Sequence, residues 1–410
     1  MNSTHLHFSA FRGRRLHLGV CGSVAAYKVC DLLRGWVRDG ISTSATLTDG
    51  ARQFVTPLSF AALGALPVYG RLDDATEAPA DEIFAHLEPG QRAQAMIIAP
   101  ASADALSRLA NGAASDMLSA QALAFSGPLV IAPAMNPRMW AHPAVRANVA
   151  ILQERGAMLV RPGCGATACG DMGEGRLADL REIHVAALRA LAPQDMAGLR
   201  VMITLGPTRE VWDGVRYWTN PSSGRMGASL AVAAWLRGAR VDAVCGPGAP
   251  WLPQGICRHD VVSARDMLAA AEAVWDAADM GVFTAAVADF SPVSAGPEKF
   301  KKEGAADGFS VRFTANPDIL KTLAARRSRG QRIMGFAAET AADLAACVRR
   351  KLASKGADMI VGNNVNQQGA GFGAPDNTVL VLDRNGREER WPARSKADIA
   401  WDLCTWLLSL

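Results

Sequence analysis

Short apolar runs alternate with longer Ala- and Leu-rich segments of helical period along most of the 410 residues. This pattern is typical of parallel strands joined by helices, because parallel neighbours need a long crossover connection. In the first half, strands are predicted at 16–21, 42–47, 95–99, 129–134 and 157–160. In the second half they are predicted at 199–204, 240–245, 280–284, 332–337 and 357–361. The sequence therefore predicts an α/β fold with Rossmann-like parallel sheets.

The chain is longer than one hydrophobic core usually supports, so two domains are expected. Pro193, Gly198 and a polar cluster interrupt the helical pattern near residue 196. We expect a first domain over 15–192 and a second over 197–410. The second should end in a β-hairpin, with Asn385-Gly386 as a type I′ turn.

Composition excludes several classes of function. The formal charge is 43 − 39 = +4, which gives no strong attraction to nucleic acid. The eight cysteines form no C-x-x-C pair, which argues against a zinc site or a disulfide framework and favours a reducing, cytoplasmic setting. No apolar run has the length of a signal-peptide core or reaches the roughly 18 residues of a membrane span. We therefore expect no membrane or nucleic-acid partner.

Small and polar residues follow the predicted strands of the first half, in "GSVAAYK" (22–28), "TDGA" (48–51), "PASAD" (100–104), "MNPRMW" (135–140) and "GCGATACGDMGEGR" (163–176). Ligands of open parallel sheets bind at this edge. Gly22-Ser23 could bind phosphate at a helix start or be only a packing turn. Neither G-x-G-x-x-G nor G-K-[ST] is present, which favours a mononucleotide. The Gly-rich segment 163–176 has the composition of an active-site lid.

These motifs together resemble the flavin mononucleotide (FMN)-dependent cysteine decarboxylase family. The resemblance implies a flavodoxin-like flavoprotein domain that binds FMN through residues of the loops named above: Gly22, Ser23, Thr48, Pro100, Ala101 and Ser102. It also implies that the flavin oxidises a cysteinyl thiol to a thioaldehyde, which is the electron sink for decarboxylation. The flavin then returns the hydride to the resulting ene-thiol.

The resemblance also assigns roles in this chemistry. His86 would serve as base or carboxylate partner, although Pro89 and Gly90 should interrupt the helix that normally follows it. Asn136 would bind the substrate carboxylate, with a helix cap as the alternative. Cys169 would donate a proton, and a disulfide with Cys164 is its structural alternative. The substrate contacts would include Met135 and, for the phosphate, Arg176.

The second half resembles phosphopantothenate–cysteine ligase. The resemblance rests on "GPTREVWDGVRYWTNPSSGRMG" (206–227), "AAVADF" (285–290), "EKFKK" (298–302), "NPDI" (316–319), "GFAAET" (335–340) and "GFG" (371–373). The two halves in this order resemble the bacterial bifunctional enzymes that make 4′-phosphopantetheine for coenzyme A. The implied substrates are 4′-phosphopantothenate, cysteine and CTP. The implied assembly is a homo-oligomer, a dodecamer of decarboxylase trimers and ligase dimers.

The ligase resemblance implies activation of a carboxylate as an acyl-cytidylate. Asn220 would hold this intermediate with help from Arg216, and Lys299 would promote its turnover. Asp289 would contact CTP or Mg²⁺, or only cap a helix. The remaining CTP contacts would be Phe336, with the base, and two lysines on one helix face, Lys351 and Lys355. Without the resemblance, we would interpret Lys299, Lys351 and Lys355 as solvated surface charges.

Two other functions are compatible with part of the chain. A flavin-binding regulatory protein would have an inactive first half, and a ligase-only enzyme would lack decarboxylation. The presence of Asn136 and Cys169 argues against the regulatory protein, and the ligase-only alternative stays open because of Pro89 and Gly90 beside His86. A prenylated-flavin synthase or a peptide cysteine decarboxylase would leave residues 199–408 unexplained.

Overall fold

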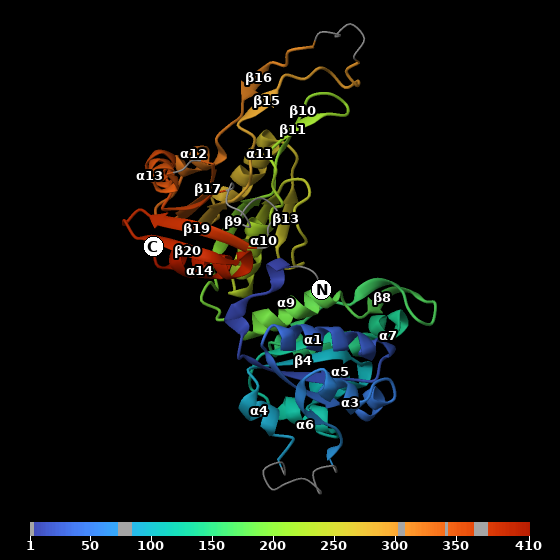
Figure 1. Cartoon of the computed structure of the whole chain (residues 1–410). Coiled ribbons are helices and arrows are strands. Elements are labelled where there is room, and N and C mark those ends of the chain that lie inside the picture. Colours follow the sequence, from blue (N-terminus) through green and yellow to red (C-terminus); the bar gives the residue numbers. More distant parts are fainter. Residues whose placement is uncertain (1–3, 73–83, 302–307, 341–342, 365–375) are drawn as a thin grey trace. The chain divides into compact units, whose positions relative to one another are not determined.

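The computed structural model describes residues 4–72, 84–301, 308–340, 343–364 and 376–410. They form two compact units (Figure 1). The first unit spans Ser9–Pro193. The second unit spans Gln194–Leu410 and includes the short N-terminal helix η1 (Thr4–Leu6). The motif 371–373 and Lys302 lie outside the described residues.

The first unit is built on a six-stranded parallel sheet in the order β3-β2-β1-β4-β5-β6. Its strands are β1 (Arg15–Val20), β2 (Ser42–Leu47), β3 (Ala65–Tyr69), β4 (Ala95–Ala101), β5 (Leu129–Pro133) and β6 (Met158–Leu159). The winding direction reverses between β1 and β4, and a crevice for ligands forms at such a position. A separate antiparallel hairpin consists of β7 (Gly163–Ala166) and β8 (Met172–Arg176).

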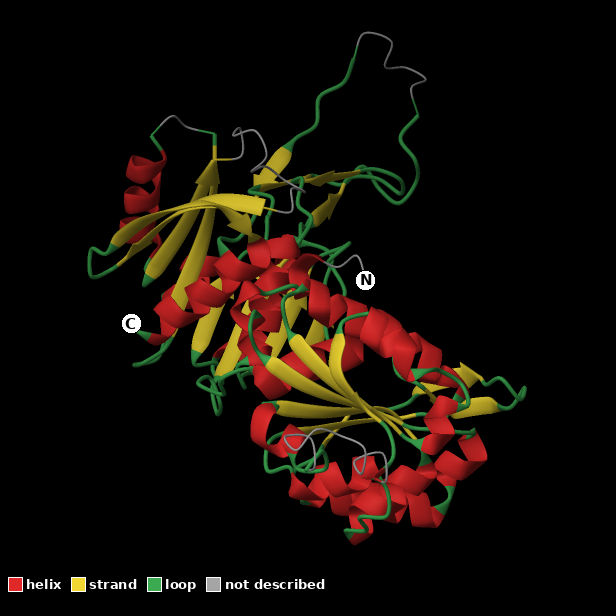
Figure 2. Cartoon of the chain, turned by 60° about the horizontal axis from the view of Figure 1, so that its bottom comes forward, coloured by secondary structure: helices red, strands yellow, loops and turns green. Residues whose placement is uncertain are grey.

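Helices cover both faces of this sheet (Figure 2). They are η2 (Ser9–Phe11), η3 (Val24–Lys28), α1 (Val29–Arg38), α2 (Asp49–Arg52), α3 (Pro57–Ala62), α4 (Glu88–Arg92), α5 (Ala103–Asn111), α6 (Met117–Ala124), α7 (Pro137–Ala141), α8 (Pro143–Glu154) and α9 (Leu180–Leu191). Helices α1 and α9 contact each other, and α5 contacts α6 and α8. In α1, Leu32, Leu33 and Trp36 recur at helical spacing and are buried, which fixes the helix against the sheet.

The second unit contains an eight-stranded sheet in the order β13-β12-β9-β14-β17-β18-β19-β20. The first six strands in this order are parallel to one another. The strand β19 is antiparallel to β18, and β20 is antiparallel to β19. The bounds are β9 (Arg200–Leu205), β12 (Arg240–Cys245), β13 (Cys257–Asp260), β14 (Met280–Phe283), β17 (Arg332–Glu339), β18 (Met359–Asn364), β19 (Asp376–Asp383) and β20 (Glu388–Ser395). Two small hairpins pair β10 (Arg209–Val211) with β11 (Tyr217–Thr219) and β15 (Phe290–Pro292) with β16 (Phe313–Ala315).

Five helices flank the second sheet: α10 (Arg225–Leu236), α11 (Ala264–Trp275), α12 (Ile319–Ala324), α13 (Leu344–Lys355) and α14 (Lys396–Leu408). Helix α10 begins at the carboxyl end of β9 and packs closely on the sheet. A Cβ atom on Gly227 would lie 2.2 Å from Thr284 Oγ1 and 2.5 Å from Leu205 Cβ. Only glycine therefore permits this approach of helix and strand.

The predicted α/β fold class is confirmed, but two local expectations are wrong and one edge strand was not predicted. The C-terminal hairpin exists, yet its turn is not type I′, because that turn needs positive φ at both central residues and Asn385 does not have it. Pro89 does not interrupt a helix, because it lies in the first turn of α4, where its missing N–H has no partner to lose. The edge strand β3, which contains Pro67, was not predicted.

Two further observations bear on the sequence analysis. All eight cysteines are unpaired, Cys164 and Cys169 included. Within the part of the chain that the structure describes, no helix combines the length and the apolar character needed to cross a bilayer.

Candidate active sites

A cavity of about 580 Å³, cavity A, opens at the carboxyl ends of β1, β2 and β4. Its walls include Gly22, Thr48 and Ser102, three of the predicted FMN residues. Thr48 Oγ1 accepts from the backbone of Ala51 at 3.2 Å and starts α2, and Ser102 Oγ accepts from Ala105 at 3.2 Å and starts α5. The first-turn N–H groups of these helices suit an anion such as a phosphate.

The loops around cavity A approach each other closely. A Cβ atom on Gly22 would lie 3.0 Å from the Cα atom of Gly50, so a side chain at Gly22 would push the two loops apart. Pro100 and Ala101 end β4 directly before Ser102. The volume of the cavity lies within the roughly 300–1,000 Å³ of small-molecule sites. Helix starts, hydroxyl groups and a glycine cradle therefore fit a flavin mononucleotide.

A second cavity of about 480 Å³, cavity B, shares Gly22, Ser102, Ala103 and Met139 with cavity A. The two cavities are therefore neighbours. Other residues around cavity B were also singled out from the sequence, namely Ser23, Met135, Asn136, Cys169 and Arg176. Ser23 Oγ accepts from the backbone of Ala25 at 3.3 Å and starts η3.

The Gly-rich segment 163–176 has regular secondary structure. Its strands β7 and β8 form a hairpin beside cavity B. The backbone N–H of Met135 donates to the carbonyl of Gly175 at 2.9 Å. A Cβ atom on Gly175 would lie 2.4 Å from the Met135 oxygen. The lack of a side chain at Gly175 thus allows the hairpin to lie against the loop that carries Asn136.

The hairpin turn brings Cys169 to Asn136, 33 positions apart in the sequence. Asn136 Nδ2 donates to Cys169 Sγ at 3.1 Å and to Asp171 Oδ2 at 2.6 Å. Asn136 Oδ1 accepts from the backbone of Arg138 at 2.8 Å, which caps α7. Asn136 is therefore a helix cap, as one of the two sequence interpretations predicts. It also lines cavity B, and its role towards a substrate carboxylate stays a prediction.

Hydrogen bonds shift the ionisation of this cluster. The pKa of Cys169 is lowered, first by the Thr167 hydroxyl at 3.1 Å and then by the backbone of Asp171 and the amide of Asn136. The pKa of the Asp171 carboxyl is also lowered, chiefly because Asn136 donates to it and with help from Arg138 at 3.1 Å. The cluster therefore stabilises negative charge at its exposed end.

The sequence analysis missed several residues of this site. Asp171 lies within the quoted motif "ACGDMGEGR" and could have been singled out as the carboxylate nearest Cys169. Lys28 lines cavity B with Arg176, which gives the cavity a second cation. His86 is half-buried and lines neither cavity among the described residues. Its ring lies 6.3 Å from that of Phe84.

In the second unit, a cavity of about 130 Å³, cavity C, lies where β14, β17 and β18 end. It is lined by the start of α10, including Arg225, and by Phe336. Three polar residues that the sequence analysis missed also line it: Asn363, Asn377 and Lys396. Burial lowers the pKa of Lys396, and Arg225 adds to the effect. The positive charges and the open helix start suit a phosphate-bearing ligand.

The other ligase candidates lie near the two small hairpins. Asn220 Nδ2 donates to the carbonyl of Val287 at 2.9 Å, two residues before Asp289. Arg216 Nη1 contacts the Asp213 carboxylate at 2.9 Å and the carbonyl of Phe300 at 3.3 Å. Asp213 and Arg216 both bond to the backbone of Phe300, and they therefore hold the segment that carries Lys299, the preceding residue.

The Asp213 carboxylate was not singled out from the sequence. Burial opposes its ionisation, but backbone N–H groups of Val215, Phe300 and Arg216 outweigh burial, and its pKa is lowered. Buried hydrogen bonds to the charged form have this effect.

Two predicted CTP lysines have carboxylate partners. Lys351 Nζ lies 2.8 Å from Glu339, and Lys355 pairs with Asp318. Neither lysine lines cavity C in the described residues, and Asp289 is exposed outside it.

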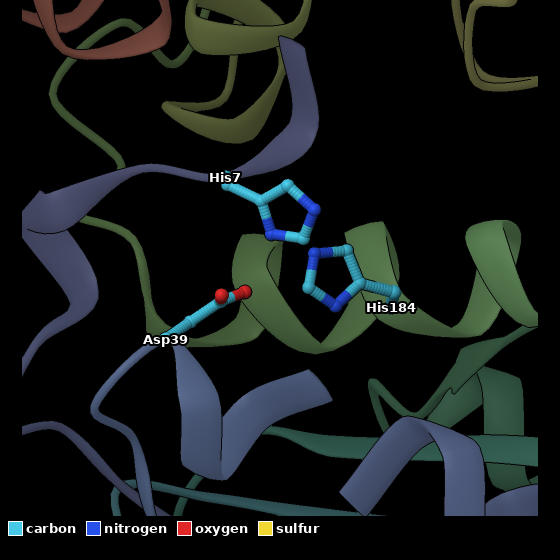
Figure 3. A group of neighbouring side chains, drawn as sticks. All are labelled: His7, Asp39 and His184. Carbon is cyan, nitrogen blue, oxygen red and sulfur yellow. The ribbon is translucent and has the colours of Figure 1, made fainter. Parts of the chain in front are cut away.

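Figure 3 shows Asp39, after the end of α1, and His184 on α9, both in the first unit. His184 Nδ1 accepts from the indole of Trp36 at 3.1 Å. His7, also drawn, belongs to the second unit. Two groups from one unit are fewer than the three or more protein ligands of a typical zinc site, and we assign no cation to this pair.

Family models match both units. Residues 7–191 match the model described as Flavoprotein. Residues 196–410 match the model described as DNA/pantothenate metabolism flavoprotein C-terminal domain. The fold and the sites therefore define a two-part flavoprotein of pantothenate metabolism.

Full-length relatives define the family more closely. The Coenzyme A biosynthesis bifunctional protein CoaBC of Bacillus subtilis (strain 168) is 40% identical over 394 residues, 95% of each chain. The same-named protein of Escherichia coli (strain K12) is 38% identical over 376 residues, 91% of this chain and 92% of the relative. The chain belongs to this family of bifunctional coenzyme A biosynthesis proteins, with a phosphopantothenate–cysteine ligase and an FMN-dependent decarboxylase.

Among solved structures, the C-terminal domain of a CoaBC protein is 33% identical. It covers 53% of this chain and 97% of its own, with a TM-score of 0.44.

Proposed function

We propose that the domain over residues 15–192 decarboxylates 4′-phosphopantothenoylcysteine in cavity B, with FMN in cavity A. When bound, the flavin takes up a hydride from the substrate and returns it, so that the reaction has no net redox change. The substrate phosphate pairs with Lys28 and Arg176, which both line cavity B. Met135 lies beside the substrate in the same cavity.

Asn136 orients the substrate carboxylate with its Nδ2 group. The hydrogen bond from this group to the Asp171 carboxylate at 2.6 Å supports the role, because it shows that the amide at this position can donate to a carboxylate. The carboxylate leaves as CO₂, and its bonding electrons stay on the substrate. His86 acts as base or as a second carboxylate partner.

Cys169 Sγ donates a proton to the ene-thiol product of decarboxylation, and solvent then restores the thiol. Thr167 and Asn136 stabilise the thiolate that remains, which makes Cys169 a stronger acid than an ordinary cysteine. This proton and the returned hydride together saturate the carbon–carbon double bond.

We propose that the domain over residues 197–410 activates 4′-phosphopantothenate with CTP and Mg²⁺. The start of α10 and Phe336, which share cavity C, receive the nucleotide. Asn220 and Arg216 hold the acyl-cytidylate, and Lys299 assists attack by the cysteine amine with release of CMP. Asp289 binds the nucleotide or its Mg²⁺ ion. Lys351 and Lys355 contact the triphosphate after leaving their carboxylate partners.

We also propose a cytoplasmic homo-oligomer, a dodecamer of trimers formed by the first domain and dimers formed by the second. His86 lines neither cavity of its own chain, and a trimer would allow it to reach a neighbouring subunit. Sedimentation analysis of the purified protein tests the assembly, and a monomer at working concentration would refute it.

The observation that carries the decarboxylase proposal is the contact of Asn136 with Cys169 over cavity B. The test is mass spectrometry of the products formed from 4′-phosphopantothenate, cysteine, CTP and Mg²⁺. We expect 4′-phosphopantetheine and CMP, and Cys169→Ser should leave an oxidised ene-thiol species. ATP replaces CTP in a parallel reaction, and equal rates would refute the preference for CTP.

Other products would identify other functions. Phosphopantothenoylcysteine without further conversion would indicate a ligase-only enzyme or a flavin-binding first half without catalysis. A chain that forms no product with either nucleotide would refute the ligase roles.

A further inference from the structure

A continuous chain of polar side chains crosses the core of the first unit. His17 on β1, Thr46 on β2 and Gln121 on α6 are each fully buried. His17 Nδ1 lies 2.8 Å from Ser44 Oγ, and its Nε2 lies 3.0 Å from Thr46 Oγ1. Thr46 donates to Gln121 Oε1 at 2.5 Å, and Gln121 Nε2 donates to the carbonyl of Ala85 at 3.0 Å.

The bonds fix one direction along this chain. Because Thr46 gives its hydroxyl proton to Gln121, its oxygen accepts from Nε2–H of His17. Burial lowers the pKa of His17 to about 3, so its imidazole is neutral. Nδ1 of the neutral ring then accepts from the Ser44 hydroxyl. In this state each of the ring nitrogens and side-chain groups named above has a hydrogen-bond partner, and the members of such a chain polarise one another.

The chain ends on the residue before His86. Ala85 is buried with Tyr69 and Met117, and its carbonyl is the acceptor for Gln121. The turn is closed by Leu87 N–H, which donates to the Phe84 carbonyl at 2.7 Å. An apolar core would tolerate several backbone positions here, whereas an unpaired buried amide of Gln121 would be costly. The bond to Ala85 therefore fixes the turn that carries His86.

We propose that His17, Thr46 and Gln121 are positioning residues that hold His86 in its productive place for decarboxylation. The inference rests on the proposed role of His86. Among the described residues, none of the three lines cavity A or cavity B, so they would act through the backbone at Ala85.

The test uses the full-length FMN-loaded protein and two variants. Gln121→Met keeps the side-chain size and removes the bond to Ala85 together with the bond from Thr46. Ser44→Ala is the matched control, because it removes a bond of the same chain and leaves the bond of Gln121 to Ala85 in place. We expect Gln121→Met to lower kcat for decarboxylation about tenfold or more, in keeping with the sensitivity of catalysis to misplacement. Ser44→Ala and ligation by either variant should stay near the parent value.

A double-mutant cycle separates positioning from general damage. In a His86→Asn background, Gln121→Met should cause no further loss, because the group that it positions is already absent. Equal losses in both backgrounds would overturn the positioning role. An unchanged rate in Gln121→Met with a large loss in His86→Asn would also overturn it, whereas no effect of His86→Asn alone would refute the proposed function of His86.

An independent observation concerns the edge of the second sheet. Asp242 on β12 and Cys257 on β13 are paired in register, and His259 lies two residues further along β13 on the same face. His259 Nε2 lies 3.0 Å from Asp242 Oδ1 and 3.5 Å from Cys257 Sγ. One ligand atom of each residue lies within 4.8 Å of the others.

These separations match tetrahedral zinc. With Zn–N of about 2.0 Å and Zn–S of about 2.3 Å, a tetrahedral angle places nitrogen and sulfur roughly 3.5 Å apart, and nitrogen and oxygen roughly 3.3 Å apart. Sulfur, imidazole and carboxylate are also the ligand types that zinc accepts. The cysteine spacing gave no zinc signal, because the third ligand comes from the neighbouring strand.

We infer that Asp242, Cys257 and His259 form a site for one Zn²⁺ ion, which joins the edge strand β13 to β12. The test equilibrates the full chain with Zn²⁺ in the absence of nucleotide and measures bound zinc by elemental mass spectrometry. Cys164→Ser, which removes an exposed cysteine elsewhere, is the matched control.

We expect one tightly bound zinc ion in the parent and in Cys164→Ser. Affinity should fall about tenfold or more in Cys257→Ser and in His259→Gln. Unchanged zinc affinity in both variants, or no zinc bound by the parent, would overturn the site. Retained ligase activity confirms that each variant is folded.

Discussion

A methyl group at Gly175 should separate the two halves of the decarboxylase site. Its Cβ atom would lie 2.4 Å from the Met135 oxygen, whereas ordinary contact begins at 3.4 Å. The hairpin and the loop must therefore move apart by the difference, 3.4 − 2.4 = 1.0 Å. The φ angle of 158° at Gly175 adds strain for any other residue.

Asn136 and Cys169 lie on opposite sides of this contact, so their 3.1 Å bond should be lost in Gly175→Ala. A misplacement of about 1 Å can cost roughly 100-fold in rate, and we expect a loss of this order in kcat for decarboxylation. The assay follows 4′-phosphopantetheine formed from 4′-phosphopantothenoylcysteine, with flavin content measured on the same sample. Ligation by the same chain serves as an internal standard and should not change.

Gly156→Ala is the matched control, because Gly156 also has positive φ but no atom within 4 Å of the added methyl group. It should lose stability through backbone strain and retain decarboxylation. A normal rate in Gly175→Ala with full flavin content would refute the argument that this close approach brings the two residues together.

Three further changes have defined outcomes. The Thr167 hydroxyl lowers the pKa of Cys169, and the protonated thiol is the active form, so the rate of decarboxylation should fall with rising pH at a lower pH than an ordinary cysteine would give. Thr167→Val should move this fall in rate to higher pH. An unmoved pH profile of kcat would contradict the assignment. Asp213→Asn should reduce ligation about tenfold by releasing Arg216, with decarboxylation unchanged, as measured by pyrophosphate release with CTP. Gly227→Ala should destabilise the second unit by about 1–3 kcal/mol through overpacking, and an unshifted denaturation midpoint would count against it.

Local sequence patterns were sufficient to predict much of the fold. The run "AMIIA" predicts a strand, and β4 is fully buried along its length, as a central parallel strand should be. The strand β12 matches the predicted range 240–245, although Asp242 interrupts its apolar residues Val241 and Ala243–Cys245. The strand β3 escaped prediction because Pro67 interrupts its short apolar run and argues against a strand. Edge strands are bound on one side only and need less apolar sequence.

The roles of single residues were harder to obtain. Asn136 could be a cap or a ligand group on sequence alone, and the structure shows the cap through Oδ1 and a bond from Nδ2 to Cys169. Lys351 and Lys355 were expected on one helix face, but the carboxylates that meet them come from β17 and from the residue before α12. Such partners are distant along the chain and follow only from packing.

Local sequence patterns were sufficient to predict two sheets of mainly parallel strands, the order of their strands along the chain and the small, polar loops at their carboxyl ends. These features depend on periodicity and turn chemistry, which act over a few residues. Only packing in three dimensions brings Asp171 and Cys169 to Asn136, and Gln121 to Ala85 across the core. Such contacts join residues about 35 positions apart, and their formation depends on how closely packed elements fit together.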